Sequence, residues 1–151
     1  MTSTPVRDQI GDQLITPENS VLAVIDYQPS QIETVGSIDH DLLLRNIITT
    51  VKVAKLFGVP IVHSTINVAN GQGPTLPGLA EELAEYPPID RTAINSWEDV
   101  EFRRAVRATG RKKLIMAALW TEVCLAFPAL DALHSAGMVN GGLHGERCVA
   151  W

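Results

Sequence analysis

The chain has 151 residues, which is enough for one domain with a sizeable core and too short for two ordinary domains. A formal net charge of −5, with 46% hydrophobic and 19% charged residues, is typical of a soluble globular protein and argues against a nucleic-acid or anionic-membrane partner. No apolar run approaches the roughly 20 residues that span a bilayer. Two cysteines do not make a disulfide framework, so we expect a reducing, cytoplasmic setting.

The chain opens with a polar segment, residues 1–20, which is broken by Pro5, Gly11 and Pro17. This pattern predicts an N-terminal arm that lies over the surface or reaches into a partner subunit. A continuous apolar run follows at 21–25 and ends in Asp26. Strands covered on both faces have this composition, and such strands belong to parallel sheets.

A helix is predicted over 39–57, because apolar residues recur there at three- and four-residue intervals. Gly58 stands just past its end and suits a C-cap. The apolar run at 59–65 predicts a second strand. Together these segments form a β-α-β unit, which should cross over right-handed.

Glycine and proline punctuate the stretch that follows. After the third long strand, helical spacing resumes with Phe127, Leu130 and Leu133. The fold class is therefore an open, mostly parallel α/β sheet with helices on both faces. The elements predicted between the second strand and this last helix are a loop at 67–77, a short helix at 79–84, at most a brief extended piece at 89–95, a helix at 97–109 and a strand at 113–119.

In such sheets, ligands sit beyond the carboxyl ends of the strands. Asp26 ends the first strand and Cys124 follows the third long strand, so both are expected at that edge. Cys124 falls in the first turn of the last predicted helix, where unpaired N–H groups and the helix dipole favour thiolate and could receive an oxyanion. The alternative is that Cys124 is a small buried hydrophobe.

Three separated motifs identify a family. The segments VLAVIDYQ, IDRTAINSW and LIMAALWTEVCLAFPALDAL together resemble the isochorismatase-like cysteine hydrolases, and within them the YcaC-like subgroup. The resemblance covers about residues 21–134. It implies a Rossmann-like three-layer fold, no cofactor, and a triad of nucleophilic Cys124, general-base Asp26 and basic Arg91.

The resemblance also implies a non-proline cis peptide at Leu119–Trp120, which would aim backbone N–H groups of Trp120 and Cys124 at an oxyanion. The implied activity is hydrolysis of a small amide-like or other carbonyl substrate through a covalent thioester. Loops around Asn67 and Trp97 would line the substrate pocket. Many relatives carry lysine at the position of Arg91, and arginine can orient a carboxylate but cannot shuttle a proton at neutral pH.

After Gly137 the chain departs from the family pattern. The glycine-rich residues 138–151 contain no apolar run and predict no buried strand. The isochorismatase-like domain, 21–137, is then expected to lack the C-terminal strands of the family fold. Residues 138–151 are expected to form an atypical tail after it. Strand 113–119 would become an exposed edge. We therefore expect a homo-oligomer, or low stability.

Other interpretations remain open. Metal-dependent relatives carry an Asp-x-His pair after the second strand, and residues 64–68 contain none, so no metal site is predicted at His63, His134 or His144. Isochorismate-type ether cleavage fits less well, because enzymes with that activity lack the cysteine nucleophile. The competing hypothesis is a catalytically silent α/β domain that acts through oligomeric assembly.

Overall fold

The computed structural model describes residues 14–137 and 147–150. Within these ranges the chain forms a five-stranded sheet in the order β3-β2-β1-β4-β5, and every neighbouring pair is parallel. The predicted open parallel α/β fold is confirmed. The strands are β1 (Ser20–Ile25), β2 (Ile61–Ile66), β3 (Ile89–Arg91), β4 (Lys113–Ala118) and β5 (Arg147–Ala150).

The sheet is organised around β1. All six of its residues are buried, because β1 pairs with β2 on one side and with β4 on the other and is covered on both faces. The register sets Ile25 beside Ser64 of β2 and beside Ala118 of β4. The residues that directly follow these strands therefore meet at one edge of the sheet.

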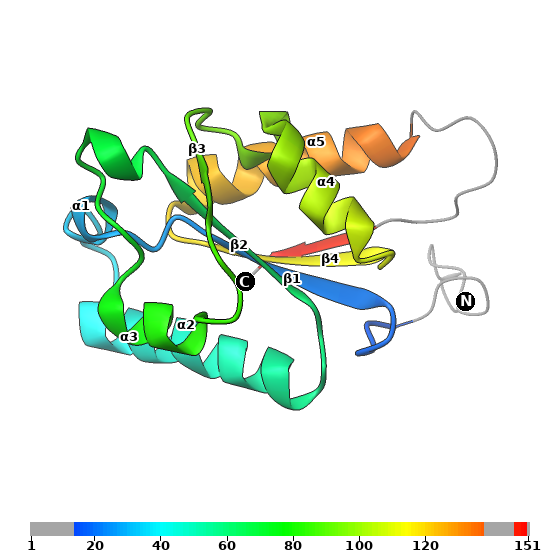
Figure 1. Cartoon of the computed structure of the whole chain (residues 1–151), viewed down its shortest axis with the longest axis horizontal. Coiled ribbons are helices and arrows are strands. Elements are labelled where there is room, and N and C mark those ends of the chain that lie inside the picture. The colour runs from blue at the N-terminus through cyan, green and yellow to red at the C-terminus, as the bar shows by residue number, and fades with distance from the viewer. Residues whose placement is uncertain (1–13, 138–146, 151) are drawn as a thin grey trace, which may run out of the picture.

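Helices cover the two faces of the sheet in separate layers (Figure 1). One core cluster packs α2 (His40–Leu56) and α3 (Pro77–Glu82) against one face. The other packs α4 (Val100–Ala108) and α5 (Ala126–Gly137) against the opposite face. No helix in the described ranges is long and apolar enough to cross a membrane.

The long helix α2 matches the prediction over 39–57. Asp39 is its N-cap, with a side chain that accepts a hydrogen bond from Leu42 N at 2.9 Å. Gly58 follows the C-cap with φ of +67°, a conformation that glycine adopts without steric cost. The helix predicted over 97–109 is shorter than expected, because a 3-10 turn at Ser96–Glu98 precedes α4.

Two features were not predicted. A short helix, α1 (Pro29–Ile32), follows β1. At the other end of the chain, β5 pairs with β4 from Lys113 to Met116. Residues 138–151, for which no buried strand was expected, include the edge strand β5 at 147–150, so the expectation that β4 is the exposed edge is wrong. The four residues of β5 follow the last glycine of the segment, so no glycine interrupts their pairing. Residues 1–13 of the expected arm and 138–146 of the tail lie outside the described residues.

Candidate active site

The carboxyl edge of the sheet brings three predicted side chains together. Asp26 directly follows β1, Arg91 is the last residue of β3, and Cys124 lies in the turn between β4 and α5. In the sequence 65 residues separate Asp26 from Arg91, and only the parallel strand order makes them neighbours. All three are buried, with 0% exposure for Asp26, 1% for Arg91 and 3% for Cys124.

Asp26 and Arg91 form a two-pronged ion pair. Arg91 Nη1 donates to Asp26 Oδ1 and Nη2 donates to Oδ2, each at 2.6 Å. This fork-to-fork geometry fixes the plane of the carboxylate, which a lysine at position 91 could not do. A buried carboxylate with no such partner would be costly, so each group supports the burial of the other.

Three further acceptors hold the Arg91 guanidinium in place. Nη1 donates to Ser64 Oγ at 3.1 Å and to the Thr65 carbonyl at 3.0 Å, and Nη2 donates to the Ile94 carbonyl at 3.0 Å. Ser64 was missed by the sequence interpretation. Its signal was available, because a hydroxyl near the carboxyl end of a fully buried strand needs a polar partner.

The backbone at Asp26 adopts a left-handed conformation with φ of +63°. Residues other than glycine adopt this conformation infrequently, and where they do it often marks a functional site. Hydrogen bonds lock it: Asp26 N donates to the Ser64 carbonyl at 3.1 Å, and Gln28 N donates to the Asp26 carbonyl at 2.9 Å. The turn directs the main chain away from β1 and leaves the carboxylate facing Arg91.

Cys124 lies in a π-helical turn, Thr121–Leu125, which opens into α5. Leu125 N donates to the Trp120 carbonyl at 3.2 Å, which is the wide spacing of a π turn. The expected cis peptide at Leu119–Trp120 is wrong, because no cis peptide occurs in the described chain. Trp120 is instead trans and extended, with φ of −95° and ψ of 103°, and the wide turn after it redirects the chain.

Asp26, Arg91 and the Trp120 backbone amide are the groups whose charge or polarity acts on the buried Cys124 thiol. Burial, followed by the charge and hydrogen bond of Asp26, raises the pKa of the Cys124 thiol to about 12, while Arg91 and the Trp120 amide act in the opposite direction. The thiolate expected from the helix terminus is therefore not the resting form. Desolvation and the neighbouring carboxylate outweigh the helix dipole.

A pocket of about 420 Å³ lies beside the Cys124 turn. Trp120 and Thr34 both line it, and the indole Nε1 of Trp120 donates to Thr34 Oγ1 at 3.1 Å. Asn67 and Trp97, the expected pocket residues, do not line it. Trp97 is 5% exposed, packs edge-on against Phe102 and donates from Nε1 to Ser135 Oγ, so it belongs to the core. The lining residues are Thr34, Val35, Gly36, Ser37, Leu119, Trp120, Thr121, Glu122 and Val123.

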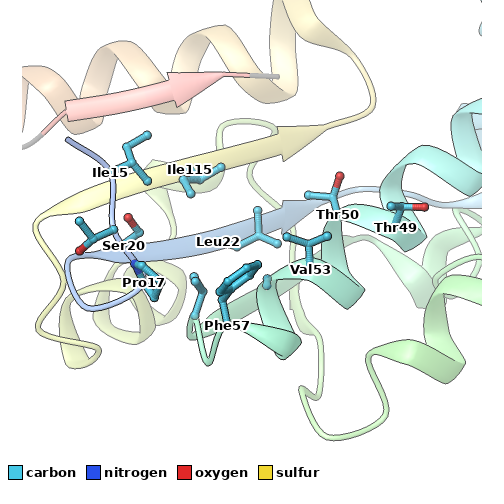
Figure 2. A pocket seen from close by; sticks show the side chains of 12 residues that line it. Ile15, Pro17, Ser20, Leu22, Thr49, Thr50, Val53, Phe57 and Ile115 are labelled. Atoms are coloured by element: carbon cyan, nitrogen blue, oxygen red, sulfur yellow. The ribbon is translucent and has the colours of Figure 1, made fainter.

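A second hollow lies at the opposite, amino edge of the sheet. Figure 2 shows this groove between α2 and the first residues of β1, with Leu22, Val53, Phe57 and Ile115 around it. Its volume is about 410 Å³, and its lining includes no acid, base or thiol. Its lining has hydroxyl groups but no base to activate them, and we place the candidate active site at the carboxyl edge.

His63 has a structural environment. Its Nδ1 donates to the Tyr86 carbonyl at 3.1 Å, so Nε2 can accept the Thr75 hydroxyl at 2.8 Å, and burial lowers the pKa of the ring. This arrangement uses both nitrogens of a neutral imidazole. Within 14–137 and 147–150, no group of three or more histidine, cysteine or acidic residues is placed to hold a metal ion.

The fold and the site define an α/β domain with a buried thiol, carboxylate and guanidinium at the carboxyl edge of a parallel sheet. The isochorismatase domain model matches residues 20–137. The chain belongs to the isochorismatase family.

The chain is similar to a curated protein of Escherichia coli strain K12 described as "Probable hydrolase YcaC", with 35% identity over 116 residues, 76% of this chain and 56% of that protein. Two solved structures have a TM-score of 0.76 and 32% identity. The E. coli YcaC gene product, described as an octameric hydrolase of unknown specificity, is matched over 89% of this chain and 63% of its own length. YcaC from Pseudomonas aeruginosa, solved with hexane-2,5-diol and covalent acrylamide, is matched over 80% of this chain and 60% of its own length. The chain thus spans about 56–63% of the length of these relatives.

Proposed function

We propose that the chain is a cysteine-dependent hydrolase that cleaves a small amide-like or other carbonyl substrate through a covalent thioester. The observation that carries this proposal is the burial of a thiol and a carboxylate at the same edge of the sheet, with a guanidinium that fixes the orientation of the carboxylate. A nucleophile, its base and a group that orients the base are the parts that nucleophilic catalysis needs.

In the proposed reaction, Asp26 takes the thiol proton while Cys124 Sγ bonds to the carbonyl carbon. The carbonyl oxygen becomes an oxyanion, for which the backbone N–H groups of Trp120 and Cys124 are the proposed donors. When the intermediate collapses, the C–N bond breaks and the amine leaves with the proton held by Asp26. Asp26 then deprotonates a water, which hydrolyses the thioester and restores the thiol.

The raised pKa of Cys124 is compatible with this role. The thiol keeps its proton in the resting site, and the Asp26 carboxylate that acts on it is the group proposed to accept that proton. Transfer to Asp26 moves charge within one buried cluster and needs no ionisation into water. Arg91 stays next to the carboxylate throughout, and we assign it an orienting and charge-balancing role rather than an acid role.

Small, uncharged amides are the proposed substrate class. The pocket beside the Cys124 turn has three hydroxyl side chains and one carboxylate in its lining, and its volume suits a compound of few heavy atoms. The acrylamide bound covalently in the P. aeruginosa relative is an electrophilic amide of this size. We infer that an amide can reach the Cys124 thiol in this chain.

Ammonia release from a panel of small amides and ureides tests the proposal, with Cys124→Ala and Asp26→Asn as matched variants. We expect turnover by the wild type and a loss of at least about 100-fold in each variant, the usual size of a nucleophile or general-base contribution. Loss only in Cys124→Ala would remove Asp26 from the mechanism. Equal turnover in all three proteins would overturn the proposal.

A second candidate function is assembly without catalysis. The observation that favours it is a row of exposed apolar side chains on α5, with Phe127 49%, Leu130 63% and Leu133 46% exposed. The E. coli relative is described as octameric. Sedimentation of the wild type against Leu130→Glu tests self-association through this row. A wild-type oligomer that dissociates in the variant, together with no turnover of any amide, would favour this function over hydrolysis.

A further inference from the structure

Gln28 lies two residues after Asp26 and is fully buried. Its Oε1 accepts a hydrogen bond from Ile66 N at 2.8 Å, and its Nε2 donates to the Ile66 carbonyl at 3.0 Å and to the Gly73 carbonyl at 2.6 Å. Both amide protons and the oxygen are thus engaged. A side chain with no free donor cannot also bind a substrate, so any effect of Gln28 on the site must pass through the groups it holds.

The Gln28 amide continues the pairing of β1 with β2 after β1 has ended. The last β1 residue, Ile25, pairs with Ser64, and Asp26 N still donates to the Ser64 carbonyl. The left-handed Asp26 then turns the main chain away. At the next level, Ile66, the side chain of Gln28 replaces the missing strand and bonds to both the N–H and the carbonyl of that residue.

Arg91 lies on the other side of Ile66, in β3. Ile66 and Arg91 are register partners between β2 and β3, and the neighbouring Thr65 carbonyl accepts from the Arg91 guanidinium. Gln28 is therefore linked through the chain to Asp26 and through Ile66 to Arg91. Ser64 also links the two sides of the ion pair, because its carbonyl accepts from Asp26 N and its Oγ accepts from Arg91 Nη1.

We propose that Gln28 is the positioning residue of the site: by bonding to Ile66 it sets the Asp26 carboxylate against both Arg91 and Cys124. The inference rests on the proposed function, because it concerns the alignment of the proposed base. Gln28 does not touch the thiol or the substrate. Its effect is to hold the strained Asp26 turn at a fixed separation from β3.

A second set of contacts separates this role from general stability. Ser30 Oγ donates to Gln72, at 3.0 Å to its carbonyl and 2.6 Å to its side chain, and fastens the same loop that Gln28 reaches at Gly73. Ser30 makes no bond to Ile66. Ser30→Ala therefore loosens the loop and leaves the Ile66 pairing intact, which makes it a matched control.

The test is the pH dependence of acrylamide addition to Cys124, followed by peptide mass spectrometry of the full chain. If the thiol passes its proton directly to Asp26, the rate should stay flat across neutral pH. If the thiol must first ionise in water, the rate rises about tenfold per pH unit, as the thiolate fraction does. We expect the rate of addition to be independent of pH in the wild type and in Ser30→Ala. In Asp26→Asn the rate should rise about tenfold per pH unit, and in Gln28→Met it should rise by that amount or by less.

Two controls exclude a purely structural effect. Val51 is a core residue of α2 that lies outside the site. Val51→Ala should lower stability and leave the rate of acrylamide addition independent of pH. Asp26→Asn with Gln28→Met should match Asp26→Asn alone, because Gln28 acts through Asp26. Gln28→Glu keeps the acceptor for Ile66 N and loses the donors, and it replaces Gln28→Met if that variant does not fold.

The outcomes are distinguishable. If the rate of addition depends on pH in Asp26→Asn but not in the Gln28 variants, the positioning role is overturned and the proposed function stands. A wild type as steep as Asp26→Asn overturns the proposed function itself. A slope in Val51→Ala equal to that in Gln28→Met, at equal loss of stability, reduces Gln28 to a structural residue.

Discussion

The two edges of the sheet are built in opposite ways. At the carboxyl edge, fully buried charges are held by a dense set of hydrogen bonds, as in the Asp26–Arg91 pair with its partners Ser64 and Thr65. At the amino edge, the groove of Figure 2 is lined by side chains such as Leu22, Val53 and Phe57, which make only apolar contacts with their surroundings.

The difference predicts how each edge responds to substitution. Apolar contacts are non-directional, and their loss scales with the area or volume removed. A buried ionic cluster fails as a unit, because removing one member leaves an uncompensated charge on another. Substitutions at the carboxyl edge should therefore couple strongly to one another and to Cys124, whereas substitutions at the amino edge should affect stability alone.

The largest effect is expected for Arg91→Met. It leaves the Asp26 carboxylate buried without its partner, and the free energy of unfolding should fall by about 3–5 kcal/mol. Denaturant unfolding at neutral pH measures this. Asp26→Asn with Arg91→Met removes both charges and should recover part of the loss. If the double variant is as unstable as the sum of the single variants, the two side chains do not form a coupled pair.

At the amino edge, Leu22→Ala should cost about 2–5 kcal/mol, because Leu22 is 1% exposed and its truncation leaves a cavity beside the groove. The pH profile of acrylamide addition to Cys124 should nevertheless match that of the wild type. A changed profile in this variant would contradict the independence of the two edges.

The protonation of Cys124 should make the carboxyl edge sensitive to alkaline pH. The folded protein holds the thiol proton with a pKa of about 12, whereas the unfolded chain releases it near a pKa of about 8.5. Stability from this group is complete below the unfolded pKa and is lost as pH rises toward 12, by up to about 1.4 kcal/mol per pH unit. Alkaline unfolding of the wild type should therefore be steeper than that of Cys124→Ala. Equal slopes would show that the thiol is not held protonated.

The smallest effect is expected at the helix that borders the groove. Asp39→Ala removes the N-cap of α2, which accepts from Leu42 N, and should cost about 1 kcal/mol of unfolding free energy. Asp39→Ser keeps an acceptor and should retain most of that stability. A loss in the serine variant equal to that in the alanine variant would mean that the cap is not the source of the effect.

The strands and the long helix were predictable because period and capping are local properties of the sequence. The run 21–25 and the Asp39-to-Gly58 helix illustrate this. The strand ends placed Asp26 and Cys124 at one edge, the resemblance added Arg91, and the structure has all three at that edge. The π turn and the trans Trp120 were not predictable, since turn geometry depends on tertiary packing. The direction of the thiol pKa was missed for a similar reason: the helix terminus is visible in the sequence, whereas burial is not.

The Gln28 pairing was also beyond sequence reasoning. A glutamine after a strand is usually a solvated residue. Its role becomes visible only when β2 supplies the Ile66 peptide. The β5 strand was not predicted because glycines dominated the composition of its segment, although pairing with β4 needs only a few residues without them.

The most direct test of the account compares the pH profiles of acrylamide addition to Cys124 in the wild type and in Asp26→Asn. In the proposed mechanism, Asp26 receives the thiol proton within the buried cluster. This mechanism predicts a rate in the wild type that is flat across neutral pH and a rate in Asp26→Asn that climbs about tenfold per pH unit. Parallel climbing profiles in both proteins would contradict it, because the thiol would then ionise without help from Asp26.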